Sequence, residues 1–293
     1  MPDGRRPASV ISPEKPLIVI NGQATDGISS LDRGLLYGDG VFETLAVEAG
    51  RPRFWLRHLA RLSAGCSRLG IPQPEAKRLL EESLAVISGI ERGVLKIIVT
   101  RGCAGRGYRS VNDAIPTRII QLHPWPDYPE TCPGSGVRVR LCRQRLGHNP
   151  VLAGIKHLNR LEQVLARGEW DDPDILEGLL LDGDERLVEG TMSNLFLIRD
   201  RVLMTPDLVR CGVAGILRTV VMELAVKVPM PLQIRALGLD DLREADEVFL
   251  TNSIIGIWPV IAVEDRPYRR GTLTCRLQEL LKDLSSDGEA WLN

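Results

Sequence analysis

Lys156 is the residue whose type and surroundings most clearly indicate chemistry. It lies in the stretch 153–162 (AGIKHLNRLE), where apolar residues and a glycine lead into a helix-like pattern. Only six of the 37 basic residues are lysines, and arginine cannot release its proton, so a lysine here indicates a need for an amine. Apolar neighbours such as Ile155 and Leu158 would desolvate the amine and make it a better nucleophile and base. An ordinary, partly buried lysine beside a helix start would also fit this stretch.

Composition excludes several classes of function. The chain has 293 residues, is 44% hydrophobic and carries a net charge of −1, so no nucleic-acid or membrane partner is expected. Residues 1–16 form a polar extension without the apolar core of a signal peptide, which favours a cytoplasmic protein. The spacing of the cysteines and histidines predicts free thiols and no metal site. The cysteines are Cys66, Cys103, Cys132, Cys142, Cys211 and Cys275.

The order of the predicted elements favours an α+β protein with two domains. Strands are expected at 17–20, 41–47, 93–100, 117–122, 137–143, 178–181, 193–198, 247–251 and 258–263, and helices near 55–69, 73–88, 158–168, 215–227 and 272–284. Residues 31–40 are expected to form a loop. Four prolines mark a linker, which separates a domain at 17–123 from one at 134–293 carrying Lys156; the linker itself is 124–133.

A lysine that bonds covalently to an aldehyde suits pyridoxal phosphate, which also needs a carboxylate near its pyridine nitrogen and a cup for its phosphate. Glu189, at a predicted strand end before a turn of small residues, is the candidate carboxylate. The segment 212–217 (GVAGIL) opens a predicted helix, where free N–H groups bind phosphate. Residues 251–253 (TNS) and Arg61 would add polar groups and a charge. Singly, each of these residues also fits a solvated turn or helix face.

Four phrases in this order resemble the fold-type IV pyridoxal phosphate enzymes, which include branched-chain aminotransferases, D-amino acid aminotransferases and aminodeoxychorismate lyases. The phrases are 156–162 (KHLNRLE), 189–196 (EGTMSNLF), 212–218 (GVAGILR) and 251–260 (TNSIIGIWPV). The likeness runs from about residue 17 to 263. Two further segments, 93–108 and 145–156, are most similar to the lyases of this family, whereas 42–44 (FET) also suits the aminotransferases.

The resemblance implies a fold of the D-amino acid aminotransferase type, a homodimer, and roles for particular residues. Lys156 would bind the cofactor covalently and act as the catalytic acid–base group, and Glu189 would meet the pyridine nitrogen. The remaining cofactor-binding residues implied are Arg61, Asn194, Gly215, Ile216, Leu217, Asn252 and Ser253. The implied reaction converts 4-amino-4-deoxychorismate to 4-aminobenzoate and pyruvate, a step of folate synthesis. The alternatives are an aminotransferase on the same fold and a non-catalytic pyridoxal phosphate-binding protein.

The glycine-rich loop 101–110 is the predicted substrate-binding element. It carries several arginines and a tyrosine between two predicted strands, and the substrate has two carboxylates that guanidinium groups can bind. Arg106 is the residue expected to contact a carboxylate, and Tyr108 and Tyr37 are the other predicted substrate residues. A solvated, arginine-rich turn would give the same pattern.

Overall fold

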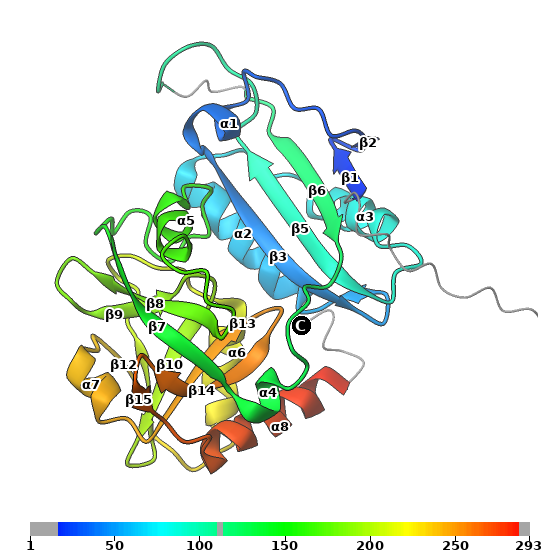
Figure 1. Ribbon diagram of the computed structural model, residues 1–293. Helices are drawn as coiled ribbons and strands as arrows, with labels where there is room; N and C mark the ends of the chain where they lie inside the picture. Colours follow the sequence, from blue (N-terminus) through cyan, green and yellow to red (C-terminus); the bar gives the residue numbers. More distant parts are fainter. Residues whose placement is uncertain (1–16, 110–113, 287–293) are drawn as a thin grey trace, which may run out of the picture. The chain divides into compact units, whose positions relative to one another are not determined.

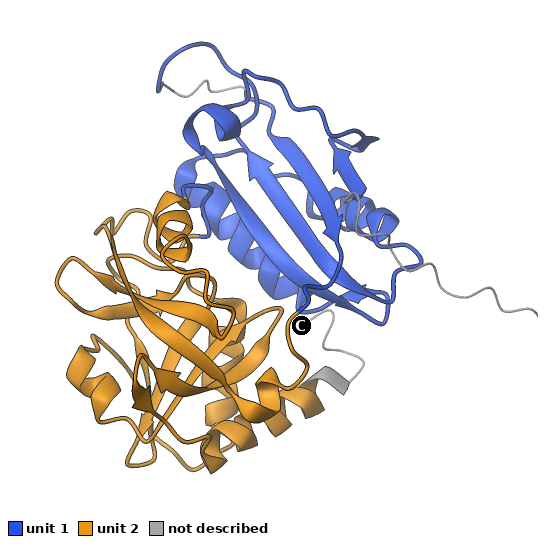
Figure 2. Ribbon diagram, viewed as in Figure 1, with its two compact units in different colours: residues 1–127, 156–159, 289–293 blue, residues 128–155, 160–288 orange. Residues whose placement is uncertain are grey.

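The chain divides into two compact units (Figure 2). A computed structural model describes residues 17–109 and 114–286 (Figure 1). The predicted extension 1–16 and the end of the predicted 101–110 loop lie outside these ranges. Among the described residues, unit 1 contains those up to 127 and the segment 156–159, and unit 2 contains 128–155 and 160–286. The boundary at 127 falls inside the stretch expected to be a linker, and the segment 156–159 groups with unit 1.

Unit 1 is an antiparallel sheet of six strands in the order β2-β1-β6-β5-β3-β4. Helices α2 and α3 lie along one side of this sheet (Figure 1). Its elements are β1 (Leu17–Ile20), β2 (Gln23–Ala24), α1 (Arg33–Tyr37), β3 (Gly40–Glu48), β4 (Arg51–Pro52), α2 (Trp55–Leu69), α3 (Ala76–Val86), β5 (Arg92–Thr100) and β6 (Thr117–His123).

Helix α2 follows the predicted amphipathic pattern. Trp55, His58, Leu62 and Cys66 recur every three or four residues and are all buried. Gly70 ends the helix with φ 64°, a left-handed conformation that glycine adopts without steric cost, and its N–H donates to the Cys66 carbonyl. A histidine on this buried face is unusual, and its partner lies on β3.

Unit 2 contains a nine-stranded sheet, mixed in strand direction. Its elements are α4 (Cys132–Ser135), β7 (Val137–Leu146), α5 (Leu161–Arg167), β8 (Ile175–Asp182), β9 (Leu187–Gly190), β10 (Asn194–Arg199), β11 (Val202–Pro206), α6 (Ile216–Ala225), β12 (Leu232–Arg235), α7 (Leu239–Arg243), β13 (Glu247–Asn252), β14 (Gly256–Val263), β15 (Arg266–Pro267) and α8 (Thr272–Ser286). Strand β9 pairs with both β8 and β10, so six strands close into a ring around an apolar core.

Two sequence expectations need correction. The stretch 31–40, expected to be a loop, contains the short helix α1, because the buried Asp32 caps it by accepting from the Gly34 N–H at 2.8 Å. The helix expected at 158–168 begins only at Leu161, because residues before it bond to strand β3 instead. Strands β11 and β12 and helix α7 were not expected, since each is only four or five residues long.

Candidate active site

The backbone of Lys156 is fixed on strand β3 in unit 1. The Phe42 N–H donates to the Lys156 carbonyl at 2.9 Å, and the Leu158 N–H donates to the Gly40 carbonyl at 3.0 Å. His157 forms an antiparallel bridge with Val41 between these two bonds. The segment 156–158 therefore behaves as a very short strand, which sets where the lysine side chain projects.

The Lys156 side chain lies against an aromatic ring. Its Nζ is 4.4 Å from the centroid of the Phe42 ring, and the residue is half-buried. The Nζ of Lys96, on β5, lies 5.4 Å from the same centroid, and burial lowers the pKa of Lys96. Two amines of unit 1 thus lie against one aromatic ring, a contact with Phe42 that the sequence alone did not reveal.

A buried ionic cluster lies on the same strand, one residue after Phe42. Both oxygens of the Glu43 carboxylate accept from Arg61, with Nε–Oε1 at 2.8 Å and Nη2–Oε2 at 2.5 Å. His58 Nδ1 lies 2.6 Å from Glu43 Oε2. Burial acts to raise the pKa of Glu43, but the guanidinium of Arg61 and the imidazole of His58 outweigh it and lower that pKa to about 2.

The pKa of His58, in this cluster, is affected by the charge of Lys156. Burial lowers the pKa of His58, the charges of Arg61 and Lys156 act in the same direction, and Glu43 opposes them. With Glu43 ionised, the neutral imidazole donates its Nδ1–H to that carboxylate. Arg61, predicted to hold phosphate, is thus oriented by a bidentate pair with Glu43, a contact that the sequence alone did not reveal.

In unit 2, the register of three neighbouring strands aligns three polar residues. Asn194 on β10 lies opposite Glu189 on β9 and also opposite Thr251 on β13. All three are buried at one end of their strands. The sheet therefore gathers candidate site residues that are up to 62 positions apart (189 to 251) in the chain.

The turn before α6 is bonded to two of these residues. The Val213 N–H donates to Glu189 Oε2 at 2.8 Å, and Asn194 Nδ2 donates to the Val213 carbonyl at 2.8 Å. A Cβ on Gly215 would lie 1.9 Å from Asn194 Oδ1, so only glycine fits at this N-cap. These contacts fix where α6 begins, and the N–H groups of its first turn, at Ile216 and Leu217, suit a phosphate.

The turn after β13 supplies hydroxyl groups. Asn252 Oδ1 accepts from the N–H groups of Ile254 and Ile255 at 2.8 and 2.9 Å, so this side chain shapes the turn that carries Ser253. The neighbouring Thr251 Oγ1 is buried and has no hydrogen-bond partner among the described residues. A buried hydroxyl without a partner carries a free-energy cost that a bound polar ligand would remove, so the residues present fit a phosphorylated cofactor.

The buried Glu177 holds the turn between β9 and β10, a role that the sequence analysis missed. Its oxygens accept from the backbone N–H groups of Gly178, Thr191 and Met192 at 2.9, 3.0 and 3.1 Å. The hydroxyls of Thr191 and Ser193 donate to it at 2.5 and 2.7 Å. Burial raises the pKa of Glu177, although the hydroxyls of Thr191 and Ser193 and the N–H groups of Gly178 and Met192 oppose that effect. The carboxylate thereby fixes the turn that separates Glu189 from Asn194.

The predicted substrate residues all lie in unit 1. The rings of Tyr37 and Tyr108 are 5.3 Å apart with an interplanar angle of 58°, and the Gly107 N–H donates to Tyr37 Oη at 3.3 Å. The side chains of Arg106 and Tyr108 are exposed, Tyr108 to 87%. Arg101, another cation of the predicted loop, is instead buried and paired with Asp39, with Nε–Oδ2 at 2.7 Å.

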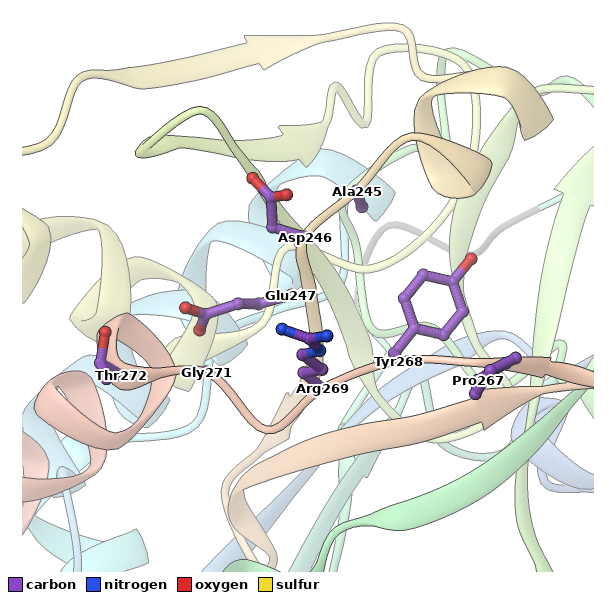
Figure 3. A pocket seen from close by; sticks show the side chains of 8 residues that line it. All are labelled: Ala245, Asp246, Glu247, Pro267, Tyr268, Arg269, Gly271 and Thr272. Atoms are coloured by element: carbon purple, nitrogen blue, oxygen red, sulfur yellow. The ribbon is translucent and has the colours of Figure 1, made fainter.

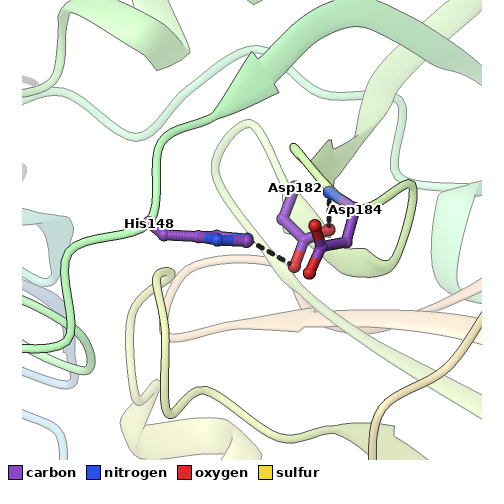
Figure 4. Close-up of side chains that lie close together, drawn as sticks. All are labelled: His148, Asp182 and Asp184. Carbon is purple, nitrogen blue, oxygen red and sulfur yellow. Dashed lines mark hydrogen bonds and ion pairs between the residues drawn. The ribbon is translucent and has the colours of Figure 1, made fainter.

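Two other clusters in unit 2 have local structural explanations. His148, Asp182 and Asp184 lie close enough to share an ion (Figure 4). Asp182, however, already accepts from His148 and from two backbone N–H groups, and Asp184 pairs with Arg210. The pocket shown in Figure 3 is lined by residues of 245–247 and 267–272, where Glu247 accepts from the Thr274 N–H at 2.8 Å and caps α8.

Comparison with known proteins places this geometry in a family. The family described as Amino-transferase class IV matches residues 40–263. The aminodeoxychorismate lyase of Vibrio harveyi is 35% identical over 88% of this chain and 97% of its own. A putative branched-chain-amino-acid aminotransferase of Methanocaldococcus jannaschii is 31% identical over 91% of this chain and 96% of its own.

Solved structures agree. A 4-amino-4-deoxychorismate lyase from Pseudomonas aeruginosa has a TM-score of 0.88 and 51% identity, covering 91% of this chain and 98% of that one. The branched-chain amino acid aminotransferase from Escherichia coli, at a TM-score of 0.83 and 24% identity over 94% of this chain and 97% of its own, supports the fold alone. The chain therefore belongs to the class IV aminotransferase family, whose members are pyridoxal phosphate-dependent enzymes of fold type IV. The sequence expectations of fold, family and cofactor are confirmed.

The Glu43 cluster generates a prediction about acid stability. The pKa of Glu43 is about 2 in the fold against 4.5 unperturbed, so its stabilisation is complete above about pH 4.5 and is lost as the pH falls towards 2. We expect Glu43→Gln to lower the free energy of unfolding by roughly 3 kcal/mol at pH 7. At pH 3.5 the destabilisation should be smaller by about 1.4 kcal/mol. Urea unfolding at both pH values measures this.

Glu48→Gln is the matched control, because this glutamate lies on the same strand with its side chain 40% exposed. Its effect at pH 7 should be small, because an exposed ion pair contributes little to stability. A Glu43→Gln effect of equal size at pH 7 and 3.5 would show that the carboxylate charge does not stabilise the fold.

Proposed function

We propose that this protein is a 4-amino-4-deoxychorismate lyase, which converts its substrate to 4-aminobenzoate and pyruvate for folate synthesis. The observation that carries the proposal is the likeness, over 91% of this chain, to a lyase structure at 51% identity, against 24% for the aminotransferase structure of similar coverage. The exposed Arg106, beside Tyr108 on a glycine-rich loop, supports it, because the substrate carries two carboxylates.

The site residues divide into binding groups and one proton carrier. Pyridoxal phosphate, when bound, supplies an electron sink through its pyridine ring. We assign its covalent attachment to Lys156 Nζ and the contact with its pyridine nitrogen to Glu189, whose carboxylate is already held by the Val213 N–H. The phosphate is assigned to Arg61, Ser253 and the first-turn N–H groups of α6, with Asn194 and Asn252 shaping the turns around it.

Lys156 also has the proton-transfer role. Its Nζ would take the proton from the ring carbon of the substrate that bears the nitrogen. Loss of that proton and of the C–O bond to the enolpyruvyl group leaves an aromatic ring. The departing group gains a proton and becomes pyruvate, so the two products account for every atom of the substrate and no oxidant is needed.

An aminotransferase is the second candidate, because the 31% identical archaeal relative carries that name and residues 42–44 (FET) suit either class. An aminotransferase transfers an amino group and releases a keto acid that keeps the carbon skeleton of its substrate. The two activities therefore give different products from different substrates. A non-catalytic binding protein is disfavoured, since Lys156, Glu189 and the phosphate-binding turns are all present.

We further propose a homodimer in the cytoplasm. Helix α5 buries Ala166 but exposes an apolar stripe, with Leu161, Val164 and Leu165 exposed to 69, 63 and 55%. A second copy of the chain is the partner that the family resemblance implies for such a face.

The cysteines among the described residues are free thiols, as a reducing compartment would keep them. No helix of the described residues is long and apolar enough to cross a membrane.

The function is tested directly by incubating the purified, cofactor-loaded protein with 4-amino-4-deoxychorismate and measuring 4-aminobenzoate and pyruvate by chromatography. We expect both products in equal amounts, with little keto acid from a panel of branched-chain and D-amino acids. Borohydride reduction followed by peptide mass spectrometry should place the phosphopyridoxyl group on Lys156. Rapid turnover of the amino-acid panel without 4-aminobenzoate would replace the lyase with an aminotransferase, and an adduct on another lysine would remove Lys156 from its role.

Glu189→Gln should separate cofactor binding from turnover. An amide keeps the shape of the carboxylate but loses the charge that favours a protonated pyridine nitrogen, which weakens the electron sink. We expect the cofactor to remain bound and 4-aminobenzoate to form at least about tenfold more slowly, which is equivalent to a loss of roughly 1.4 kcal/mol of transition-state stabilisation. Steady-state kinetics with a cofactor titration measure both, and turnover at the wild-type rate would exclude Glu189 from the site.

If the exposed apolar stripe of α5 lies in the dimer interface, a charge introduced there should disrupt the dimer. Val164→Glu should shift the mass measured by light scattering from two chains towards one, because burying an unpaired carboxylate is costly. Val226→Glu is the control, since Val226 is 86% exposed at the end of α6 and outside the stripe. If wild-type protein has the mass of one chain at micromolar concentration, the dimer proposal is wrong.

A further inference from the structure

Arg33, on helix α1, is a buried cation that bonds to the backbone of the predicted substrate loop. The residue is 4% exposed. Its Nη1 and Nη2 donate to the carbonyls of Gly107 and Tyr108 at 2.9 and 3.1 Å, and its Nε donates to Asp39 Oδ2 at 2.8 Å. Its backbone N–H also donates to the Gly102 carbonyl at 2.9 Å. One arginine thus contacts the loop at three residues without using any of the loop's side chains.

Tyr37 reinforces this contact from the other end of α1. The Arg33 guanidinium lies 4.9 Å from the centroid of the Tyr37 ring, and that ring lies beside the ring of Tyr108. Tyr37 Oη accepts from the Gly107 N–H. The backbone of residues 107 and 108 is therefore bonded on both its N–H and carbonyl sides, while the Arg106 side chain next to it remains exposed.

Helix α1 is itself firmly anchored, so it can serve as a fixed support. Asp32, its buried N-cap, accepts from the hydroxyls of Thr100 on β5 and Thr117 on β6 at 2.9 and 2.7 Å. Asp39 pairs with Arg101 as well as Arg33, and Arg101 also donates to the carbonyls at the end of α2. The support thus connects to two strands and a helix of unit 1.

We propose that Arg33 is a positioning residue, which holds the loop backbone so that Arg106 is presented to a carboxylate of the substrate. The inference rests on the proposed function for the identity of that substrate. Arg106 lies between Gly105 and Gly107, and Gly107 has φ 101°, so the segment has wide backbone freedom unless it is held. The two carbonyl bonds from Arg33 restrict that freedom before substrate binds, which spares binding the cost of ordering the loop.

Arg33→Lys is the informative variant. Lysine keeps the positive charge beside Asp39, but a single ammonium group lacks the planar fork that reaches a carboxylate and two carbonyls together. We expect the Michaelis constant for 4-amino-4-deoxychorismate to rise about tenfold, with turnover at saturation and cofactor affinity changed less than about twofold. A fall in turnover with an unchanged Michaelis constant would overturn the proposal.

A second readout does not depend on activity. Trypsin cleaves after arginine when the chain can open locally, so releasing the loop should speed cleavage of the Arg106–Gly107 bond by about fivefold or more. Mass spectrometry of timed digests measures this bond specifically. Arg53→Lys is the matched control, because Arg53 lies over the Phe54 ring in the same unit and pairs with Glu48. Its digestion and kinetics should match wild type.

The double variant with Arg106→Ala shows whether Arg33 acts through Arg106. If it does, adding Arg33→Lys to Arg106→Ala raises the Michaelis constant no further, whereas independent effects would multiply and contradict the proposal. Should Arg33→Lys fail to fold, Tyr37→Phe removes one bond to the loop and should speed the same cleavage to a smaller extent. Faster cleavage in a protein that makes no 4-aminobenzoate would uphold the contact and refute the lyase, and unchanged cleavage in both variants would refute the contact.

Discussion

The pairing of residues 156–158 with strand β3 is the constraint on which the reactive amine depends. A lysine side chain has four rotatable bonds, so its amine is placed only as well as its backbone is. Hydrogen bonds from Phe42 to the Lys156 carbonyl and from Leu158 to the Gly40 carbonyl fix that backbone. The next residue of β3 after Phe42 is Glu43, which fixes Arg61. Adjacent positions of one strand therefore organise both the amine and a cation predicted to bind phosphate.

In unit 2, the register of the strands places the candidate site residues side by side. Because Asn194 pairs with Glu189 on one side and with Thr251 on the other, a slip of one residue in β10 would break the alignment of all three. The buried Glu177 opposes such a slip by bonding the turn that joins β9 to β10. A carboxylate with five donors is expensive to bury without them, so the turn and Glu177 stabilise each other.

The sequence indicated candidate chemical groups but not the residues that support them. Glycine-punctuated strand ends and a lysine before an apolar helix pattern are local features, so they indicated Lys156, Glu189 and the turn at 212–217. The partners of Glu43 and Arg33 could not be found in this way. His58 lies 15 positions from Glu43, and Gly107 lies 74 positions from Arg33, so only the folded sheet brings them together. Arg101 is a further case. By its place in the sequence it is a cation of the 101–110 loop, but its guanidinium donates to Asp39 and to the end of α2, which are distant in the sequence.

These contacts give a physical reason for arginine rather than lysine at several positions inside unit 1. Arg33, Arg61 and Arg101 each donate to a carboxylate inside unit 1, a task that suits a planar fork that cannot lose its proton. Lysine would serve poorly there, because burial favours its neutral form and a single ammonium satisfies fewer acceptors. Conversely, Lys96 and Lys156 lie over the Phe42 ring, where an arginine could not act as a base. At these positions of unit 1, arginine provides a permanent charge that holds the structure, whereas the two lysines over Phe42 provide amines that can gain or lose a proton.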